Sequence, residues 1–295
     1  MKNPFHGLGV ALITPFTAEQ AVDYDALEEL VDSLLKGGAD FLCILGTTAE
    51  TPCLENDEKQ EIIRRIVEQN NGRVPLLLGC GSNNTASVVQ YLKETDLNGI
   101  DGVLIVTPYY NKPSQEGLYQ HFSAVAAATD KPVVLYNVPG RTGVNLQAST
   151  TLRIAGDCPN VVAIKEASGK LDQIETIIQN APDGFEVLSG DDAVTFELLS
   201  LGAVGVISVI GNAYPEAFGT MVHAVLKENM PEALALHRKL HPLYSLMTAD
   251  GNPAGIKSLL TAQGKIKNVL RLPLVPATTA TLDAIKEYAA AFKEE

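Results

Sequence analysis

Cysteine is scarce in this sequence and tryptophan is absent. The four cysteines, Cys43, Cys53, Cys80 and Cys158, form no C-x-x-C pair, so their spacing indicates neither a zinc ribbon nor a disulfide framework. The first residues, MKNPFHGLG, do not have a cationic segment followed by an apolar one, which is the pattern of a secretory signal. We therefore expect a reduced, cytoplasmic protein.

Positive charge is also in short supply. The chain of 295 residues has 22 Lys and Arg against 35 Asp and Glu, a formal net charge of -13, and the basic residues are scattered. Nucleic acids and anionic lipid surfaces are bound by clustered cations, so neither is an expected partner. The longest uncharged stretch, residues 198–215, is interrupted by glycine, serine and asparagine, which favours a buried strand with loops over a membrane span.

Hydrophobic residues make up 46% of the chain and gather in short, β-branched runs. These runs are continuous rather than alternating, as is typical of strands that are covered on both faces in a parallel sheet. The sequence predicts eight such strands, at residues 10–14, 41–46, 75–80, 102–107, 132–137, 161–166, 185–190 and 205–209.

Segments with helical periodicity separate the strands, and early strand starts recur about every 30 residues, the length of a strand, a helix and two loops. Eight such units predict an α/β fold, a (β/α)8 TIM barrel, although an open doubly wound sheet has the same local pattern. After residue 212 only helical segments follow. We expect a catalytic barrel over residues 1–228 and a helical C-terminal extension over residues 229–295.

Active sites of such barrels lie at the carboxyl ends of the strands. Lys165 follows the apolar run VVAI near the end of a predicted strand. Burial favours the uncharged form of an amine, which attacks ketones to form a Schiff base. A lysine at this position can equally leave the strand and extend to solvent, and the strand pattern alone does not separate the two interpretations.

Other polar residues at the strand ends have two interpretations as well. Tyr136 ends the strand before Lys165 and is either a proton shuttle or a packed aromatic side chain. Arg141, in the loop PGRTG, offers a fork for a carboxylate or is simply an exposed loop residue. The pair Thr47 and Thr48 follows Gly46, where a turn or a helix cap is also common.

Signals for a cofactor or a metal are weak. The loop at residues 79–84 resembles the start of a dinucleotide-binding loop, but Asn84 stands where the third glycine is needed. His237 and His241 are four residues apart without an acidic or cysteine ligand placed beside them. We expect no cofactor and no metal.

Five motifs in this order and spacing resemble the dihydrodipicolinate synthase family, also called 4-hydroxy-tetrahydrodipicolinate synthases. They are GTTAET (46–51), TPYYNKPSQEGLYQHF (107–122), LYNVPGRTG (135–143), IKEASG (164–169) and LSGDD (188–192). The resemblance implies a lyase that condenses pyruvate with L-aspartate 4-semialdehyde in diaminopimelate and lysine biosynthesis. It also implies a homotetramer built as a dimer of dimers.

The resemblance assigns roles to single residues. It implies that Lys165 forms the imine with pyruvate, and that Tyr136 is the general acid and base. Thr47 and Tyr110 would complete a proton relay, with Tyr110 reaching the neighbouring subunit's site. The substrates would be held by Thr48, Arg141, Gly190 and the backbone at Ile207, with Arg141 binding the semialdehyde's carboxylate.

Two departures from the family pattern matter. Ala49 replaces the glycine usual in GTTGE, which alters the loop slightly without removing a reacting group. Asn56, Lys59 and Ser87 stand where lysine-inhibited members commonly carry histidines and an acidic residue, so we expect little or no lysine feedback. The pocket implied by the resemblance comprises Thr51, Pro52, Asn56, Lys59, Asn83, Ser87 and Tyr109.

Two alternatives remain at this stage. One is another pyruvate-dependent aldolase, such as N-acetylneuraminate lyase or a 2-keto-3-deoxy sugar acid aldolase, which shares the Schiff-base lysine but resembles this chain less at GRTG and TPYYN. The other is a catalytically silent barrel that binds a keto acid. The complete set of Lys165, Tyr136, Thr47, Tyr110 and Arg141 argues against a silent barrel.

Overall fold

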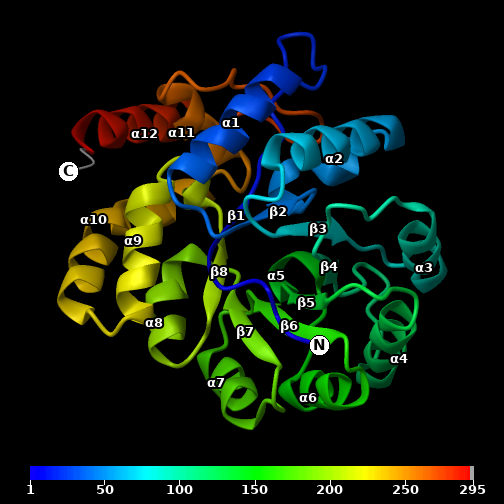
Figure 1. The fold of residues 1–295 in the computed structure, drawn as a ribbon. Coiled ribbons are helices and arrows are strands. Elements are labelled where there is room, and N and C mark those ends of the chain that lie inside the picture. The colour runs from blue at the N-terminus through cyan, green and yellow to red at the C-terminus, as the bar shows by residue number, and fades with distance from the viewer. Residues whose placement is uncertain (293–295) are drawn as a thin grey trace.

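Eight parallel strands close into a barrel in the computed structural model, which describes residues 1–292. Each strand pairs with the next along the chain, and β8 pairs with β1. Figure 1 shows the strands at the centre and the helices around them. The predicted (β/α)8 barrel is confirmed, and the β1–β8 pairing rules out the open sheet. The strands are β1 Gly7–Ala11, β2 Phe41–Ile44, β3 Leu76–Cys80, β4 Gly102–Val106, β5 Val133–Asn137, β6 Val161–Glu166, β7 Glu186–Ser189 and β8 Gly205–Ser208.

Helices follow the strands, and α10–α12 extend beyond the barrel series, as the sequence predicts. In Figure 1, α12 lies beside α11, and α10 lies beside α9. The division of the chain between residues 228 and 229 stays a prediction. The helices are α1 Tyr24–Lys36, α2 Asn56–Asn70, α3 Thr85–Glu94, α4 Gln115–Ala126, α5 Pro139–Thr142, α6 Ala148–Asp157, α7 Leu171–Asn180, α8 Thr195–Ser200, α9 Pro215–Leu226, α10 Met230–Thr248, α11 Ala254–Ala262 and α12 Thr279–Ala291.

The first strand was predicted wrongly. It covers Gly7–Ala11, three residues before the predicted start and end at residues 10–14. Glycine is depleted in strands, so Gly7 and Gly9 hid the true start. Gly9 is required by packing, because a Cβ added there would lie 2.1 Å from Cζ of Phe41 inside the barrel.

Alternation along the strands divides the core into two parts. One hydrophobic cluster, which includes Phe41, Leu104 and Tyr136, fills the barrel interior, and a larger one lies between the strands and the helices. Because successive side chains of a strand point to opposite faces, a residue next to an interior one faces the helices. At the end of β6, Lys165 lies on the interior face, as does its register partner Tyr136, and Glu166 lies on the face towards the helices.

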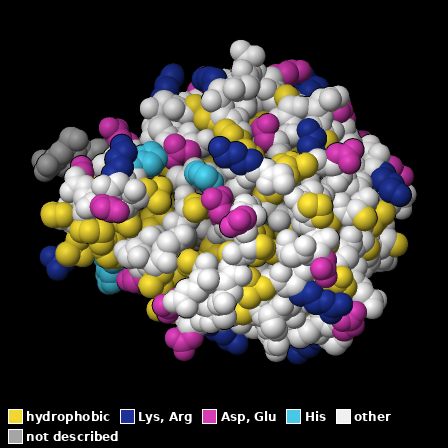
Figure 2. All heavy atoms as spheres, turned by 60° about the horizontal axis from the view of Figure 1, so that its bottom comes forward, with side chains coloured by type: hydrophobic (Ala, Val, Ile, Leu, Met, Phe, Trp, Pro, Cys, Tyr) yellow, Lys and Arg dark blue, Asp and Glu magenta, His cyan; other side chains and the backbone are white. Residues whose placement is uncertain are grey.

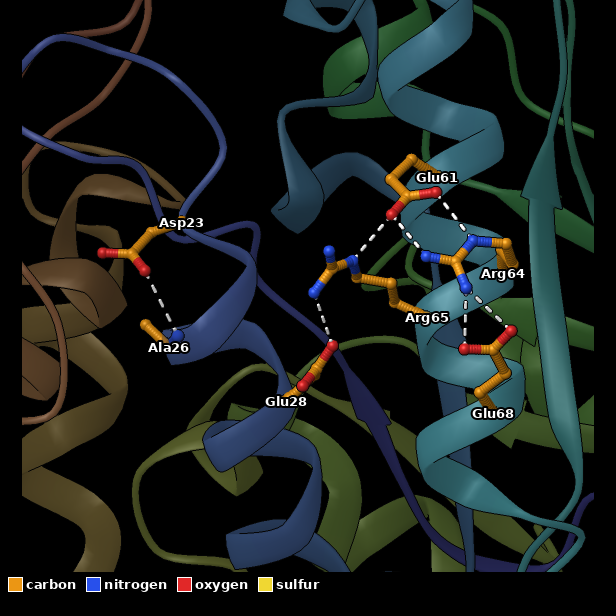
Figure 3. Close-up of polar contacts among 7 residues, drawn as sticks. All are labelled: Asp23, Ala26, Glu28, Glu61, Arg64, Arg65 and Glu68. Atoms are coloured by element: carbon orange, nitrogen blue, oxygen red, sulfur yellow. Dashed lines mark hydrogen bonds and ion pairs between the residues drawn. The ribbon is translucent and has the colours of Figure 1, made fainter.

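Ion pairs at the molecular surface link α1 to α2 (Figure 3). Arg65 of α2 donates to Glu28 of α1 at 2.8 Å and to Glu61 of its own helix at 2.7 Å. Arg64 also binds Glu61, at 2.6 Å. Pairs of this kind are solvent-accessible and contribute little stability each, about 0–1 kcal/mol. They add polar contacts between two helices that already pack against each other.

Charge on the surface is mixed. Figure 2 shows Lys and Arg side chains interspersed with Asp and Glu on the face drawn, and apolar side chains gathering at its left edge. Within residues 1–292, none of the helices has the length and apolar character needed to cross a membrane.

Candidate active site

A cavity of about 880 Å³ opens where the strands end at their carboxyl termini. Its walls come from the ends of the strands and the segments after β2 to β8, from α2, α3 and the end of α10, and from Asn252 before α11. This is the end of the barrel at which active sites lie. The structure brings six of the predicted site residues to this one cavity, namely Thr47, Thr48, Tyr136, Arg141, Lys165 and Gly190.

Lys165 is buried in the cavity wall. Its exposed fraction is 7%, so the alternative in which it extends to solvent does not apply. Tyr136 is its register partner on β5, and Lys165 Nζ lies 4.4 Å from the centroid of the Tyr136 ring. Gly190 makes room for the lysine, because a Cβ added at Gly190 would come within 3.0 Å of Cγ and Cε of Lys165.

A buried polar network holds the two strand ends that carry these residues. Asn137 and Glu166 are also register partners, and Asn137 Nδ2 donates to Glu166 Oε1 at 3.0 Å. Gln173 Nε2 of α7 donates to Glu166 Oε2 at 3.1 Å, and Leu146 N donates to Asn137 Oδ1 at 2.9 Å. Burial raises the pKa of Glu166, and these donors oppose that rise. The network fixes β5 against β6 directly behind Tyr136 and Lys165.

The Thr47–Ala49 turn after β2 is a short 3-10 helix, η1. Two left-handed residues bracket it, Leu45 with φ of 51° and Glu50 with φ of 56°. This conformation is costly for residues other than glycine, so the surroundings must hold the turn in place. One such contact is a hydrogen bond from Asn252 Nδ2 to Thr48 Oγ1 at 2.9 Å.

Arg141 lies at the cavity mouth on the short helix α5. It is exposed, and one of its guanidinium nitrogens donates to the Asn252 carbonyl at 3.3 Å. An arginine fork at this place can bind a carboxylate with two parallel hydrogen bonds.

Three predicted site residues do not line this cavity. Tyr110 is 89% exposed, whereas Ile207 is 1% exposed inside the barrel, and after β8 the lining residues are Val209 and Ile210. Asn83 lies outside it too, with its carbonyl accepting from Asn111 Nδ2 at 2.9 Å. The predicted role of the Ile207 backbone stays a prediction. The other residues of the predicted allosteric pocket line the same cavity, namely Thr51, Pro52, Asn56, Lys59, Ser87 and Tyr109.

The structure adds two residues that the sequence analysis did not single out. Asp192 lines the cavity and accepts hydrogen bonds from the backbone of Val209 at 3.0 Å and of Ile210 at 2.8 Å, which fixes the loop after β8. Burial raises its pKa to about 6. The Asp-Asp pair directly after a strand was a usable signal for Asp192. Asn252, which contacts both Thr48 and Arg141, had no signal because it lies far from them in the sequence.

Within residues 1–292, no group of three or more His, Cys, Asp and Glu side chains is arranged to hold a metal ion. Cys43 and Cys80 line the cavity, but burial raises the pKa of both thiols, that of Cys43 to about 11. They are therefore protonated at neutral pH and are weak nucleophiles.

Comparison with known proteins identifies the family. Residues 4–292 match the model of the dihydrodipicolinate synthetase family. A 4-hydroxy-tetrahydrodipicolinate synthase of Phocaeicola vulgatus is 58% identical over 95% of this chain and 94% of its own. The dihydrodipicolinate synthase structure from Thermotoga maritima superposes with a TM-score of 0.95 at 41% identity, over 98% of this chain and 99% of that one. A monomeric dihydrodipicolinate synthase variant superposes with a TM-score of 0.94 at 41% identity, over 97% and 96%. The chain therefore belongs to the dihydrodipicolinate synthetase family.

Proposed function

We propose that this chain condenses pyruvate with L-aspartate 4-semialdehyde to give 4-hydroxy-tetrahydrodipicolinate, in lysine and diaminopimelate biosynthesis. Family membership supports the reaction. The observation that carries the mechanism is the buried amine of Lys165, which lies in the cavity wall beside Tyr136.

Lys165 begins the reaction as a nucleophile. Its amine adds to the ketone carbon of pyruvate, and loss of water leaves an imine between the lysine and the substrate. The imine nitrogen is protonated and withdraws electrons, so the adjacent methyl group loses a proton and becomes the carbon of an enamine. The protein supplies the electron sink through its own side chain, and the proposal needs no added cofactor.

The enamine carbon then attacks the aldehyde carbon of the semialdehyde. A new carbon–carbon bond forms, and the aldehyde oxygen takes up a proton to become a hydroxyl group. The amine of the semialdehyde adds to the imine carbon and displaces the Lys165 amine, which closes the ring and regenerates the enzyme. One water is released overall, in the imine-forming step.

Proton transfers in these steps are assigned to Tyr136, with Thr47 and a partner subunit's copy of Tyr110 completing the relay. Tyr136 and Thr47 line the cavity. Thr48, Gly190 and the backbone at Ile207 are assigned to pyruvate. The carboxylate of the semialdehyde is assigned to Arg141, which is at the mouth of the cavity, where a second substrate enters after pyruvate is bound.

Tyr110 also bears on assembly. Its side chain is 89% exposed and its backbone is left-handed, with φ of 72°. Neither feature serves the chain's own cavity, whereas both suit a side chain presented to another subunit. These features support a contact between subunits, and the family resemblance supplies the rest of our assignment: a homotetramer, a dimer of dimers, in the cytoplasm. Analytical ultracentrifugation tests this assignment, and a monomer with full activity would overturn it.

A substrate comparison tests the function. The purified chain is incubated with pyruvate and either L-aspartate 4-semialdehyde or a sugar-derived aldehyde, and the products are identified by mass spectrometry. We expect turnover with the semialdehyde. Turnover with the sugar aldehyde alone would favour a sugar acid aldolase, and pyruvate binding without turnover of either would favour a silent barrel.

A further inference from the structure

Glu50 and Lys257 form an ion pair that none of the proposed steps uses. The side chains of both residues are fully buried, with 0% exposed. Glu50 directly follows the Thr47–Ala49 turn, and Lys257 lies on α11, 207 positions along the chain. The pair therefore joins the turn at the cavity to the helices beyond the barrel.

Both charged groups are fully engaged. The second Glu50 oxygen, Oε2, accepts from Arg271 N at 3.0 Å. Lys257 Nζ also donates to the Val269 carbonyl at 3.0 Å and lies 4.1 Å from the centroid of the Phe16 ring. The carboxylate is thus held by α11 on one side and by the segment after α11 on the other.

Glu50 is coupled to the catalytic turn through its backbone. Glu50 N donates to the Thr47 carbonyl at 3.1 Å, and its φ of 56° places it in the left-handed region. A glutamate keeps that conformation only when its environment fixes it. A shift of the Glu50 side chain therefore moves the residue that closes the turn, and Thr47 with it.

Stability alone does not explain this pair. Two charges lose their hydration when they are buried, and apolar residues of similar volume are often at least as stabilising. An ion pair with additional hydrogen bonds differs from an apolar pair in fixing direction and distance. The Glu50–Lys257 pair therefore fixes the position of the Thr47–Ala49 turn relative to α11.

We propose that Glu50 and Lys257 are positioning residues, which hold the Thr47–Ala49 turn in the geometry that captures pyruvate. The inference rests on the proposed function and deepens it. The C-terminal helices then act in substrate binding through this pair, although neither residue lines the cavity.

The test compares variants by borohydride trapping of the pyruvate imine at Lys165, with the thermal unfolding midpoint measured in parallel. Glu50→Gln/Lys257→Met removes both charges together. Glu28→Gln is the control, because it removes a carboxylate that pairs with Arg65 at 2.8 Å, in an ion pair separate from those of Glu50, Lys257 and Arg271. We expect the double variant to fold and to need about tenfold more pyruvate for half-saturation of imine trapping. The half-saturating pyruvate concentration of the control should stay within about twofold of the wild-type value.

Each outcome decides the inference. A folded double variant with wild-type half-saturation would show that the pair is only structural. If the double variant does not fold, Lys257→Arg replaces it, since that change keeps the cation and alters its geometry. A half-saturating concentration raised about threefold then supports positioning, and an unchanged one contradicts it. A wild-type chain that forms no adduct overturns the proposed function, and this inference with it.

Discussion

The amine of Lys165 lies against the ring face of Tyr136, with Nζ 4.4 Å from the ring centroid. The contact follows from the register of the barrel, which pairs Tyr136 on β5 with Lys165 on β6. Both side chains are 7% exposed, so bulk water does not surround the amine. A buried amine beside a tyrosine is suited to imine chemistry, since each step of that chemistry moves a proton.

Tyr136→Phe removes the hydroxyl and keeps the ring. We expect turnover to fall by about 10²–10⁴-fold, the usual contribution of a general acid and base. The thermal unfolding midpoint should change little, because the phenyl ring keeps its packing against Lys165. Steady-state kinetics and thermal unfolding measure the two effects. Turnover within about twofold of wild type would show that another group transfers the proton.

Arg141→Lys keeps the charge at the cavity mouth and removes the planar fork. We expect the KM for L-aspartate 4-semialdehyde to rise by about tenfold or more, because a lysine cannot hold a carboxylate with two parallel hydrogen bonds. The KM for pyruvate should stay within about twofold. An effect on pyruvate alone would place the pyruvate carboxylate, and not that of the semialdehyde, at Arg141.

Feedback by lysine should be weak or absent. The cavity wall carries Lys59 together with Asn56 and Ser87, so an incoming lysine meets a like charge and finds no carboxylate on these three residues. Activity at saturating pyruvate should therefore be unchanged when micromolar L-lysine is added. Inhibition at micromolar L-lysine would contradict the assignment of this pocket. The paired variant Lys59→Ala/Ser87→Glu removes the repulsion and adds a counter-charge, and it should bind lysine more tightly in calorimetry.

His121 makes stability depend on acid pH. It is 3% exposed, Thr85 Oγ1 lies 2.9 Å from its Nδ1, and burial lowers its pKa from 6.5 to about 4. Between these values the unfolded chain binds more protons than the folded one, so this contribution to stability is lost as pH falls from about 6.5 towards 4.

The variant His121→Gln isolates that contribution. The free energy of unfolding of wild type should fall by roughly 2–3 kcal/mol relative to the variant as pH drops from 7 to about 4. Asp192, whose raised pKa of about 6 acts with the opposite sign, is present in both proteins and cancels. His241→Gln, at an exposed site, is the control. A pH-independent difference would show that His121 titrates normally.

The fold was predictable from the sequence because it depends on local patterns. Continuous apolar runs marked seven strands to within about two residues, and the helices between them have clear periodicity. The first strand was the exception, because Gly9 is demanded by packing against Phe41, and Gly7 by its left-handed φ of 75° and the close approach of Asp40, rather than by strand propensity. Packing partners distant in the sequence leave no local pattern.

The site residues that follow strands were predictable, because the carboxyl ends of the strands meet at one end of the barrel. Lys165, Tyr136 and Thr47 each follow a recognisable strand, so their shared cavity follows from closure of the barrel. Two contacts join residues far apart in the sequence: Thr48 and Asn252 are separated by 204 positions, and Glu50 and Lys257 by 207. No strand or helix pattern indicates where the loop before α11 returns to the barrel mouth.

The central claim is that pyruvate is bound covalently to Lys165. Wild type and Lys165→Ala are incubated with pyruvate and borohydride, digested, and analysed by mass spectrometry, with circular dichroism showing that both are folded. We expect a reduced pyruvate adduct on the wild-type peptide that contains Lys165, and none on the folded variant. An adduct on another lysine, or a wild-type chain without an adduct that still turns over both substrates, would contradict the account.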